Sequence, residues 1–385
     1  MSDVNLKKLI GEALIEIVDA AKGGGKFVPI GLMSSGSELG SEEMALGGRL
    51  AQQQYPFIKV VMIGPRVKGF DDLEWIETDD CEADIQNAME KALKEGRIKG
   101  AVALHYPFPL GVATVGMIHA PAKGKPLIIS TSTGTSSANR VEAMVLNAIY
   151  GIAVAKARGI KKPEVGILNV DGAQMVYRSL RKLAEGGYDI TFGSSVRSDG
   201  GPILRGNDLI AGSVDVCVTD TLTGNVLVKI FSAYNTGGNY EALGWGYGPS
   251  VGEGWGYVVS IISRASGAHV IANAIYFTAE VSLAGLPSLV RGELERARNA
   301  GLESILAQLE SKGEGGKSQV EPPKPEPTDE EIHGIDVLTI EDAVKTLWAS
   351  GIYAESAMGC TGPVVKVPSR FLDKAKEVLA EGGYI

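Results

Sequence analysis

The sequence is short of cysteine and of positive charge. Only three cysteines stand among 385 residues, so we expect no disulfide framework, and their spacings match no metal motif. Lys and Arg number 37 against 46 Asp and Glu, which gives a net charge of −9. No basic stripe interrupts this balance. Because nucleic-acid binding depends on clustered cations, we expect no nucleic-acid partner.

Long apolar runs are also missing. Residues 100–122 carry no formal charge, but Pro107 and Pro109 interrupt them, which favours a buried strand and loop over a membrane helix. Residues 1–21 show the charged pattern of an amphipathic helix and lack the apolar core of a signal peptide. We therefore expect a cytoplasmic protein with no membrane partner.

Several catalytic signatures are absent as well. The four histidines fit no ligand pattern, and the sequence contains no HExxH, CxxC or Ser-His elbow motif. Its glycine-rich runs include neither GxxxxGK[ST] nor a clean GxGxxG after the first strand. These absences argue against metalloprotease, hydrolase, kinase and nicotinamide-dependent functions. We expect no metal and no cofactor.

Glycine, in contrast, is abundant, with 50 residues spread without a collagen period. Between the glycine-rich turns, short apolar runs alternate with helical segments. The predicted strands are 27–32, 58–63, 101–104, 126–130, 164–170, 189–193 and 214–219, and the predicted helices include 82–95, 139–158 and 173–185. Strands that alternate with helices in this way predict parallel sheets with right-handed crossovers, and thus an α/β fold.

A boundary lies late in the chain. Residues 311–331 read SKGEGGKSQVEPPKPEPTDEE, with four prolines, many charges and little to bury. Such a composition is typical of a semi-extended linker. The pattern of helices and strands returns beyond it. We therefore predict a linker over 311–332 and a small C-terminal α/β module over 333–385.

Three turns rich in Ser, Thr and Gly follow predicted strands, at 33–41, 130–137 and 220–225. Backbone N–H groups in such turns, together with the start of the next helix, can hold phosphate. The same residue types also cap helices, and for any one turn capping is the commoner outcome. Three turns at the carboxyl ends of parallel strands favour a ligand. The candidate phosphate or acyl contacts are Ser34, Gly36, Ser37, Ser132, Gly134, Thr135, Ser136, Thr223, Gly224 and Asn225.

Cys360 is the cysteine best placed for chemistry. Cys217 lies mid-strand in VDVCVT, which is typical of a core residue, and Cys81 lies among carboxylates in DDCE, a poor setting for a nucleophile. Cys360 lies in AMGCTGP, where the neighbouring glycines leave the thiol uncrowded. Reactivity requires the thiolate. The alternative interpretation is a small buried hydrophobe, the usual role of a free cysteine.

Two segments resemble signatures of the phosphate acyltransferases of phospholipid synthesis, relatives of phosphotransacetylase. Residues 148–170 (AIYGIAVAKARGIKKPEVGILNV) are similar to a helix-then-strand signature, and residues 215–229 (DVCVTDTLTGNVLVK) to a second one. One departure is Asp171-Gly172-Ala173-Gln174, which replaces the family's acidic turn containing lysine.

This resemblance implies two Rossmann-like parallel-sheet domains around a cleft, as in phosphate acyltransferases and isocitrate dehydrogenase. It implies a first domain made of residues 1–125 and 221–310. The second domain, residues 126–220, is inserted into the first. The small C-terminal module completes the expected fold class.

The whole chain is more similar to the protein C alpha subunit of glycine/sarcosine/betaine reductase, an enzyme complex of anaerobic amino-acid fermentation. AESAMGCTGPVV at 354–365, after DVLTIEDAV at 336–344, carries this resemblance. It implies an acetyl thioester on Cys360 that inorganic phosphate releases as acetyl phosphate. The implied partners are a carboxymethylated selenoprotein and the beta subunit of protein C, so we expect an oligomeric assembly.

Two other interpretations stay open. One is a free-standing phosphate acyltransferase that converts acyl thioesters to acyl phosphates, with the tail as a structural appendage. The other is a non-catalytic scaffold subunit whose Gly/Trp/Tyr loop over 237–256 docks another protein. An acyl donor that labels Cys360 would favour the reductase interpretation over both.

Overall fold

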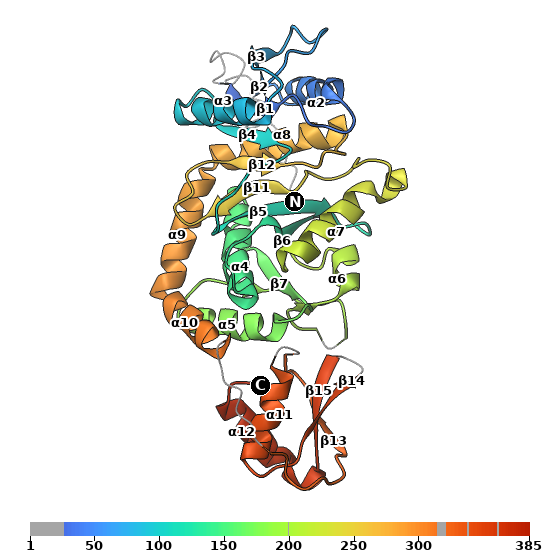
Figure 1. Cartoon of the computed structure of the whole chain (residues 1–385), viewed down its shortest axis with the longest axis vertical. Coiled ribbons are helices and arrows are strands. Elements are labelled where there is room, and N and C mark those ends of the chain that lie inside the picture. The colour runs from blue at the N-terminus through green and yellow to red at the C-terminus, as the bar shows by residue number, and fades with distance from the viewer. Residues whose placement is uncertain (1–26, 199, 314–320, 337–338, 360–361) are drawn as a thin grey trace, which may run out of the picture. The chain divides into compact units, whose positions relative to one another are not determined.

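The computed structural model describes residues 27–198, 200–313, 321–336, 339–359 and 362–385 (Figure 1). The helix expected over residues 1–21 lies outside this range. The described residues divide into two units. Unit 1 comprises 27–107, 228–250 and 255–287, and unit 2 comprises 108–227, 251–254 and the described residues from 288 onward. The domain limits given above stay predictions.

Unit 1 is built on a mostly parallel sheet with the strand order β3-β2-β1-β4-β12-β11. All neighbours are parallel except β11 and β12. The strands are β1 (Val28–Met33), β2 (Ile58–Ile63), β3 (Glu74–Ile76), β4 (Gly100–Ala103), β11 (Gly248–Gly252), which continues into unit 2, and β12 (Val259–Ile261). Continuous apolar strands such as VPIGLM in β1 fit a sheet that is covered on both faces.

The helices of unit 1 are α2 (Ser41–Gln54), α3 (Glu82–Lys94) and α8 (Ala268–Leu283). Helices α2 and α8 share a hydrophobic core with β1 and β2, which includes Ile30, Met44 and Ile271. Gly47 allows the two helices to approach closely, because a Cβ atom there would lie 2.5 Å from the Ile271 side chain.

Unit 2 contains the strand order β5-β6-β10-β7-β8, and β9 also pairs with β7. Its strands are β5 (Val112–His119), β6 (Pro126–Gly134), β7 (Glu164–Leu168), β8 (Thr191–Phe192), β9 (Ile203–Leu204) and β10 (Val216–Val218). Its helices are α4 (Arg140–Ala157), α5 (Ala173–Glu185), α6 (Gly206–Ala211), α10 (Leu302–Gly313), the start of α7 (Thr221–Ala233) and most of α9 (Leu286–Asn299). Because β6, β10 and β7 run parallel, their carboxyl ends meet at one edge of the sheet.

The end of the chain folds around a small antiparallel sheet with the order β13-β15-β14. The strands of this module are β13 (Glu330–Ile332), β14 (Glu355–Gly359) and β15 (Gly362–Val367), and its helices are α11 (Ile340–Ala349) and α12 (Leu372–Glu381). Val344, Leu347, Val365 and Leu379 belong to its core. Strands β14 and β15 pair up to Gly359 and Gly362. Cys360 follows directly in the sequence but lies outside the described residues.

The expected α/β class is confirmed, while two local expectations were wrong. Strand β5 is antiparallel to β6, and the sequence did not predict it as a separate strand. Strand β6 also continues to Gly134, because Thr133 and Gly134 still pair with β5. Ser132 and Gly134 therefore lie in a strand rather than in a turn. Within the described residues no single helix is long and apolar enough to cross a membrane, although α8 and α9 pass that test as a bent pair.

Candidate functional site

The structure brings two of the predicted segments of unit 2 into contact. The side-chain amide of Asn225 donates a hydrogen bond to the Ser132 carbonyl oxygen at 3.0 Å, and the hydroxyls of Thr131 and Thr221 lie 3.0 Å apart. A Cβ atom on Gly224 would lie only 1.8 Å from the Thr131 carbonyl oxygen. The glycine of the Thr-Gly-Asn motif is therefore required by the close approach of α7 to β6.

Asp220 directly precedes helix α7 and organises this contact. Its carboxylate accepts hydrogen bonds from the Thr223 backbone N–H at 3.1 Å and from the Thr223 hydroxyl at 2.6 Å. Burial alone would raise the pKa of Asp220, but the bonds from Thr223 and the charge of Arg140 hold the pKa below its usual value. Asp220 is therefore an ionised cap in the manner expected of aspartate at a helix start.

Arg140 supplies a cation at the same edge of the sheet. Its guanidinium lies 3.2 Å from the Asp220 carboxylate and 3.6 Å from the Asp171 carboxylate. Arg140 opens helix α4 directly after Asn139, whose side chain accepts hydrogen bonds from the N–H groups of Val141 and Glu142. The Arg140 side chain is 42% exposed, so a ligand from solvent can reach it.

Neither Arg140 nor Asp220 is among the site residues predicted from the sequence. A signal for Asp220 was available, since an aspartate directly before an apolar helix is a common N-cap. The pairing of Arg140 with Asp171 and Asp220 had no local signal, because the three residues follow or open elements that are distant in sequence.

Ser132 and Ser136, two predicted phosphate contacts, use their hydroxyl groups in hydrogen bonds within the protein. The Ser132 hydroxyl is buried and lies 2.9 Å from that of Thr114. The Ser136 hydroxyl donates to the Asn147 side chain at 2.6 Å, and Asn147 donates to the Thr219 carbonyl oxygen at 3.0 Å. This buried network joins β6, α4 and the end of β10. Within the 132–136 segment, Thr135 is exposed.

The turn after β1 belongs to unit 1 and has different surroundings. The Ser34 hydroxyl donates to the Pro65 carbonyl oxygen, and the Ser37 hydroxyl donates to that of Arg264. Gly36 lines a cavity of about 230 Å³ together with Asp80 and Glu82. Two carboxylates make this cavity unfavourable for an anion. The assignment of Ser34, Gly36 and Ser37 to phosphate stays a prediction.

The other cysteines fit the sequence analysis. Cys217 is fully buried, and burial raises the pKa of its thiol to about 12, which confirms it as a core residue. Cys81 is exposed. Among the residues that the structure describes, no group of three or more His, Cys, Asp or Glu side chains is placed to hold a metal ion.

Comparison with known proteins assigns the chain to a family. The model of the family described as "Fatty acid synthesis protein" matches residues 28–366. The chain is also 47% identical over 390 residues to the "Glycine/sarcosine/betaine reductase complex component C subunit alpha" of Peptoclostridium acidaminophilum, and the alignment covers 100% of both chains. The chain belongs to the fatty acid synthesis protein family. Within this family, the resemblance to component C alpha subunits is confirmed.

More distant members of the fatty acid synthesis protein family match parts of the chain. The "Phosphate acyltransferase" of Thermotoga petrophila is 28% identical over 233 residues, which cover 52% of this chain and 67% of that protein. The "Phosphate acyltransferase" of Phenylobacterium zucineum is 43% identical over 94 residues, or 23% and 25% of the two chains. A branched-chain phosphotransacylase from Enterococcus faecalis V583 aligns with 66% of this chain and 99% of its own at a TM-score of 0.46 and 15% identity, a likeness too distant to bear on function.

Proposed function

We propose that the chain is the acyl-transfer subunit of an amino-acid reductase complex, in which phosphate releases an acetyl group from Cys360 as acetyl phosphate. The observation that carries the proposal is the 47% identity to a component C alpha subunit along the entire chain. That alignment extends through the C-terminal module and so includes Cys360. A carboxymethylated selenoprotein would deliver the two-carbon group: the C–Se bond breaks, the methylene carbon is reduced to methyl as selenium is oxidised to the selenenic level, and the carboxyl carbon gives up one oxygen to selenium and becomes the Cys360 thioester. A beta subunit of protein C would complete the component.

The release step is a substitution at the acyl carbon. A phosphate oxygen attacks the thioester carbonyl, the C–S bond breaks, the Cys360 sulfur leaves as a thiolate, and acetyl phosphate forms. No cofactor takes part, and phosphate is the second substrate. Covalent catalysis of this kind divides a difficult acyl transfer into two easier steps.

The Arg140 site offers this reaction a place for phosphate. A guanidinium presents N–H donors in a fork that matches two phosphate oxygens. Asp220 fixes one side of Arg140 at 3.2 Å, while Asp171 contacts it at 3.6 Å and is 56% exposed. Phosphate would displace the loosely held Asp171 and keep the contact with Asp220. The first turn of α7, where Thr223 lies, borders the same position through Asp220.

A test of the proposal starts from Cys360→Ser in the complete complex. We expect this variant to form no acetyl phosphate from the carboxymethylated selenoprotein, while Cys81→Ser, at an exposed cysteine, keeps wild-type activity. Mass spectrometry after incubation with acetyl phosphate should find an acetyl adduct on Cys360. Acetyl phosphate formation by Cys360→Ser at the wild-type rate would contradict the proposal.

The Thermotoga petrophila relative supports a second candidate, a free-standing phosphate acyltransferase, because it matches 52% of the chain. That function predicts acyl phosphate formation from soluble acyl thioesters by the isolated chain, and no effect of Cys360→Ser.

A further inference from the structure

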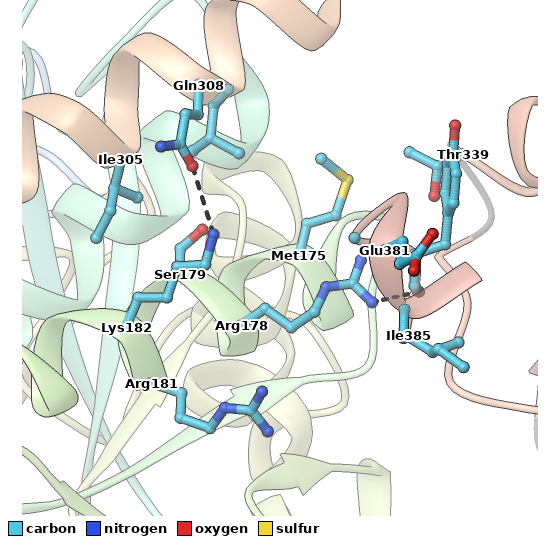
Figure 2. A pocket seen from close by; sticks show the side chains of 14 residues that line it. Met175, Arg178, Ser179, Arg181, Lys182, Ile305, Gln308, Thr339, Glu381 and Ile385 are labelled. Carbon is cyan, nitrogen blue, oxygen red and sulfur yellow. Dashed lines mark hydrogen bonds between the residues drawn. The ribbon is translucent and has the colours of Figure 1, made fainter. Parts of the chain in front are cut away.

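Unit 2 contains a pocket that shares no residue with the Arg140 site. It is a cavity of about 360 Å³ lined by α5, α10 and the C-terminal module (Figure 2). None of the residues assigned above to the phosphate site lines it. Its volume falls within the range of small-molecule pockets, roughly 300 to 1,000 Å³.

One face of helix α5 brings three cations to this pocket. Arg178, Arg181 and Lys182 all line it, and their spacing of three and four residues places them on the same side of the helix. Figure 2 shows Arg178 extending towards Glu381 and Ile385 at the end of the module, while Lys182 extends towards Gln308 on α10. The pocket also receives the carboxylate of Glu381, so its ionisable side chains carry an excess of positive charge.

Two of these cations, Arg178 and Lys182, donate hydrogen bonds to neutral groups. Arg178 donates to the carbonyl oxygens of Tyr384 at 2.5 Å and Gly334 at 3.4 Å. Lys182 donates to the Gln308 side chain at 3.4 Å. Arg181 lies 3.6 Å from Glu185, one turn further along the same helix.

Arg178 is partly buried and interacts with both a carboxylate and a second cation. Burial lowers the pKa of Arg178, the charge of Arg181 lowers it further, and the charge of Asp336 opposes them. A partly desolvated guanidinium beside a second cation gains more from an incoming anion than one in water does.

The remaining lining combines polar side chains, among them Ser179, Gln308 and Thr339, with an apolar part. Met175 from α5 and Ile305 and Leu309 from α10 line the pocket. We propose that this pocket binds a small organic oxyanion, with its carboxylate or phosphate on Arg178, Arg181 and Lys182 and a short apolar body against Met175, Ile305 and Leu309.

Such a ligand would contact α5 and the end of the module at the same time. Binding to the docked arrangement stabilises it in proportion to ligand concentration, by mass action. The bound anion would therefore hold the end of the C-terminal module against helix α5. This inference does not depend on the reaction proposed for Cys360.

Hydrogen–deuterium exchange of the full chain tests the inference, with inorganic phosphate and butyrate as separate probes at constant ionic strength. We expect saturable protection of peptides that cover residues 173–185 and 372–385. A response to phosphate alone assigns a phosphate ligand, and a response to butyrate alone assigns a carboxylate. Either response supports the site.

Substitutions at exposed positions then identify the contacts. Arg181→Gln and Lys182→Gln should each raise the probe concentration for half-maximal protection about tenfold, which corresponds to the loss of one charge-assisted hydrogen bond. Lys161→Gln, at an exposed lysine outside the pocket, is the matched control and should behave as wild type. The Arg140→Gln background should retain the protection, which separates this pocket from the Arg140 site.

Two results would overturn the inference. One is the absence of protection of either peptide by both probes. The other is protection that Arg181→Gln and Lys182→Gln leave unchanged.

Discussion

Asn225 donates its side-chain amide to the Ser132 carbonyl oxygen at 3.0 Å, and this bond joins the first turn of α7 to the end of β6 across 93 residues of sequence. Together with Gly224, which packs directly against Thr131, it fixes the start of α7 on the sheet. The position of Asp220, and through it that of Arg140, depends on this attachment.

We expect Asn225→Asp to destabilise the protein by about 1 to 3 kcal/mol, because a carboxylate would face the Ser132 carbonyl oxygen in place of an N–H donor. The free energy of unfolding from chemical denaturation measures the effect. Asn207→Asp, at an exposed position on α6, serves as control and should remain within about 0.5 kcal/mol of wild type. Equal stability of both variants would show that the bond to Ser132 contributes nothing.

Gly224→Ala should destabilise the protein by about 3 kcal/mol or prevent folding, since the new Cβ atom would meet the Thr131 carbonyl oxygen at 1.8 Å. Gly206→Ala, also in the first turn of a helix, is the control. Nothing lies within 4 Å of a Cβ atom built there, so we expect no loss and a gain of up to about 1 kcal/mol. Thermal unfolding of the two variants measures the effect. A Gly224→Ala variant as stable as wild type would contradict the close approach of α7 to β6.

Glu293 should make unit 2 sensitive to acid. Its fully buried carboxylate accepts from Lys156 and Arg296 at 2.7 Å each and from Tyr188 at 3.0 Å. Burial alone would raise the pKa of Glu293, but the bonds from Arg296 and Lys156 outweigh it and lower the pKa. A lowered folded-state pKa contributes stability above the unfolded value of about 4.3, and this stability is lost as the pH falls through the folded-state value.

We therefore expect the free energy of unfolding to fall steeply below about pH 4.3, and Glu293→Gln to flatten that dependence. At pH 7 the variant should lose about 3 kcal/mol, because Lys156, whose side chain is only 21% exposed, keeps its charge without its carboxylate. Glu303→Gln, which removes a carboxylate that is 68% exposed, should cost less than about 1 kcal/mol. Denaturant titrations from pH 3 to 7 would contradict the assignment if both variants kept the wild-type slope.

Arg140→Gln should raise the phosphate concentration needed for half-maximal acetyl phosphate formation by about 10 to 100-fold, which corresponds to the loss of a charged hydrogen bond. Asp171→Asn should lower that concentration, because it removes a carboxylate that competes with phosphate for Arg140. The two substitutions thus act in opposite directions on KM for phosphate. Steady-state kinetics with Lys162→Gln as control would exclude the phosphate role of Arg140 if all three variants had the wild-type KM.

The sequence predicted the fold where the signal is local. Apolar runs such as IKVVMI gave strand β2 with its observed limits, and the periodicity of residues 82–95 gave α3 to within one residue. Strand β5 was missed because the prolines and glycines of residues 107–116 indicate turns when they are interpreted alone. Pairing with β6 overrides that local signal.

The site was predictable in part for the same reason. One motif contains Thr223, Gly224 and Asn225. Because this motif follows a predicted strand, as the 132–136 segment does, its position predicts that the two lie close together. Arg140 could not be found in this way, because its role arises only when the ends of β7 and β10 come beside α4. The proposals for Cys360, for phosphate binding by the Thr-Gly-Asn motif and for the partners rest on family resemblance. The experiments above test them.

The Asp220 carboxylate accepts a hydrogen bond from the first turn of α7 and forms an ion pair with Arg140. The stability of the helix and the charge at the candidate site therefore depend on the same side chain. A substitution that altered the charge near Arg140 would also loosen the helix, so selection for folding alone preserves the carboxylate. A descendant that had lost the reaction would still retain it. Conservation of the Asp220–Arg140 pair among relatives would therefore report on folding as well as on phosphate binding.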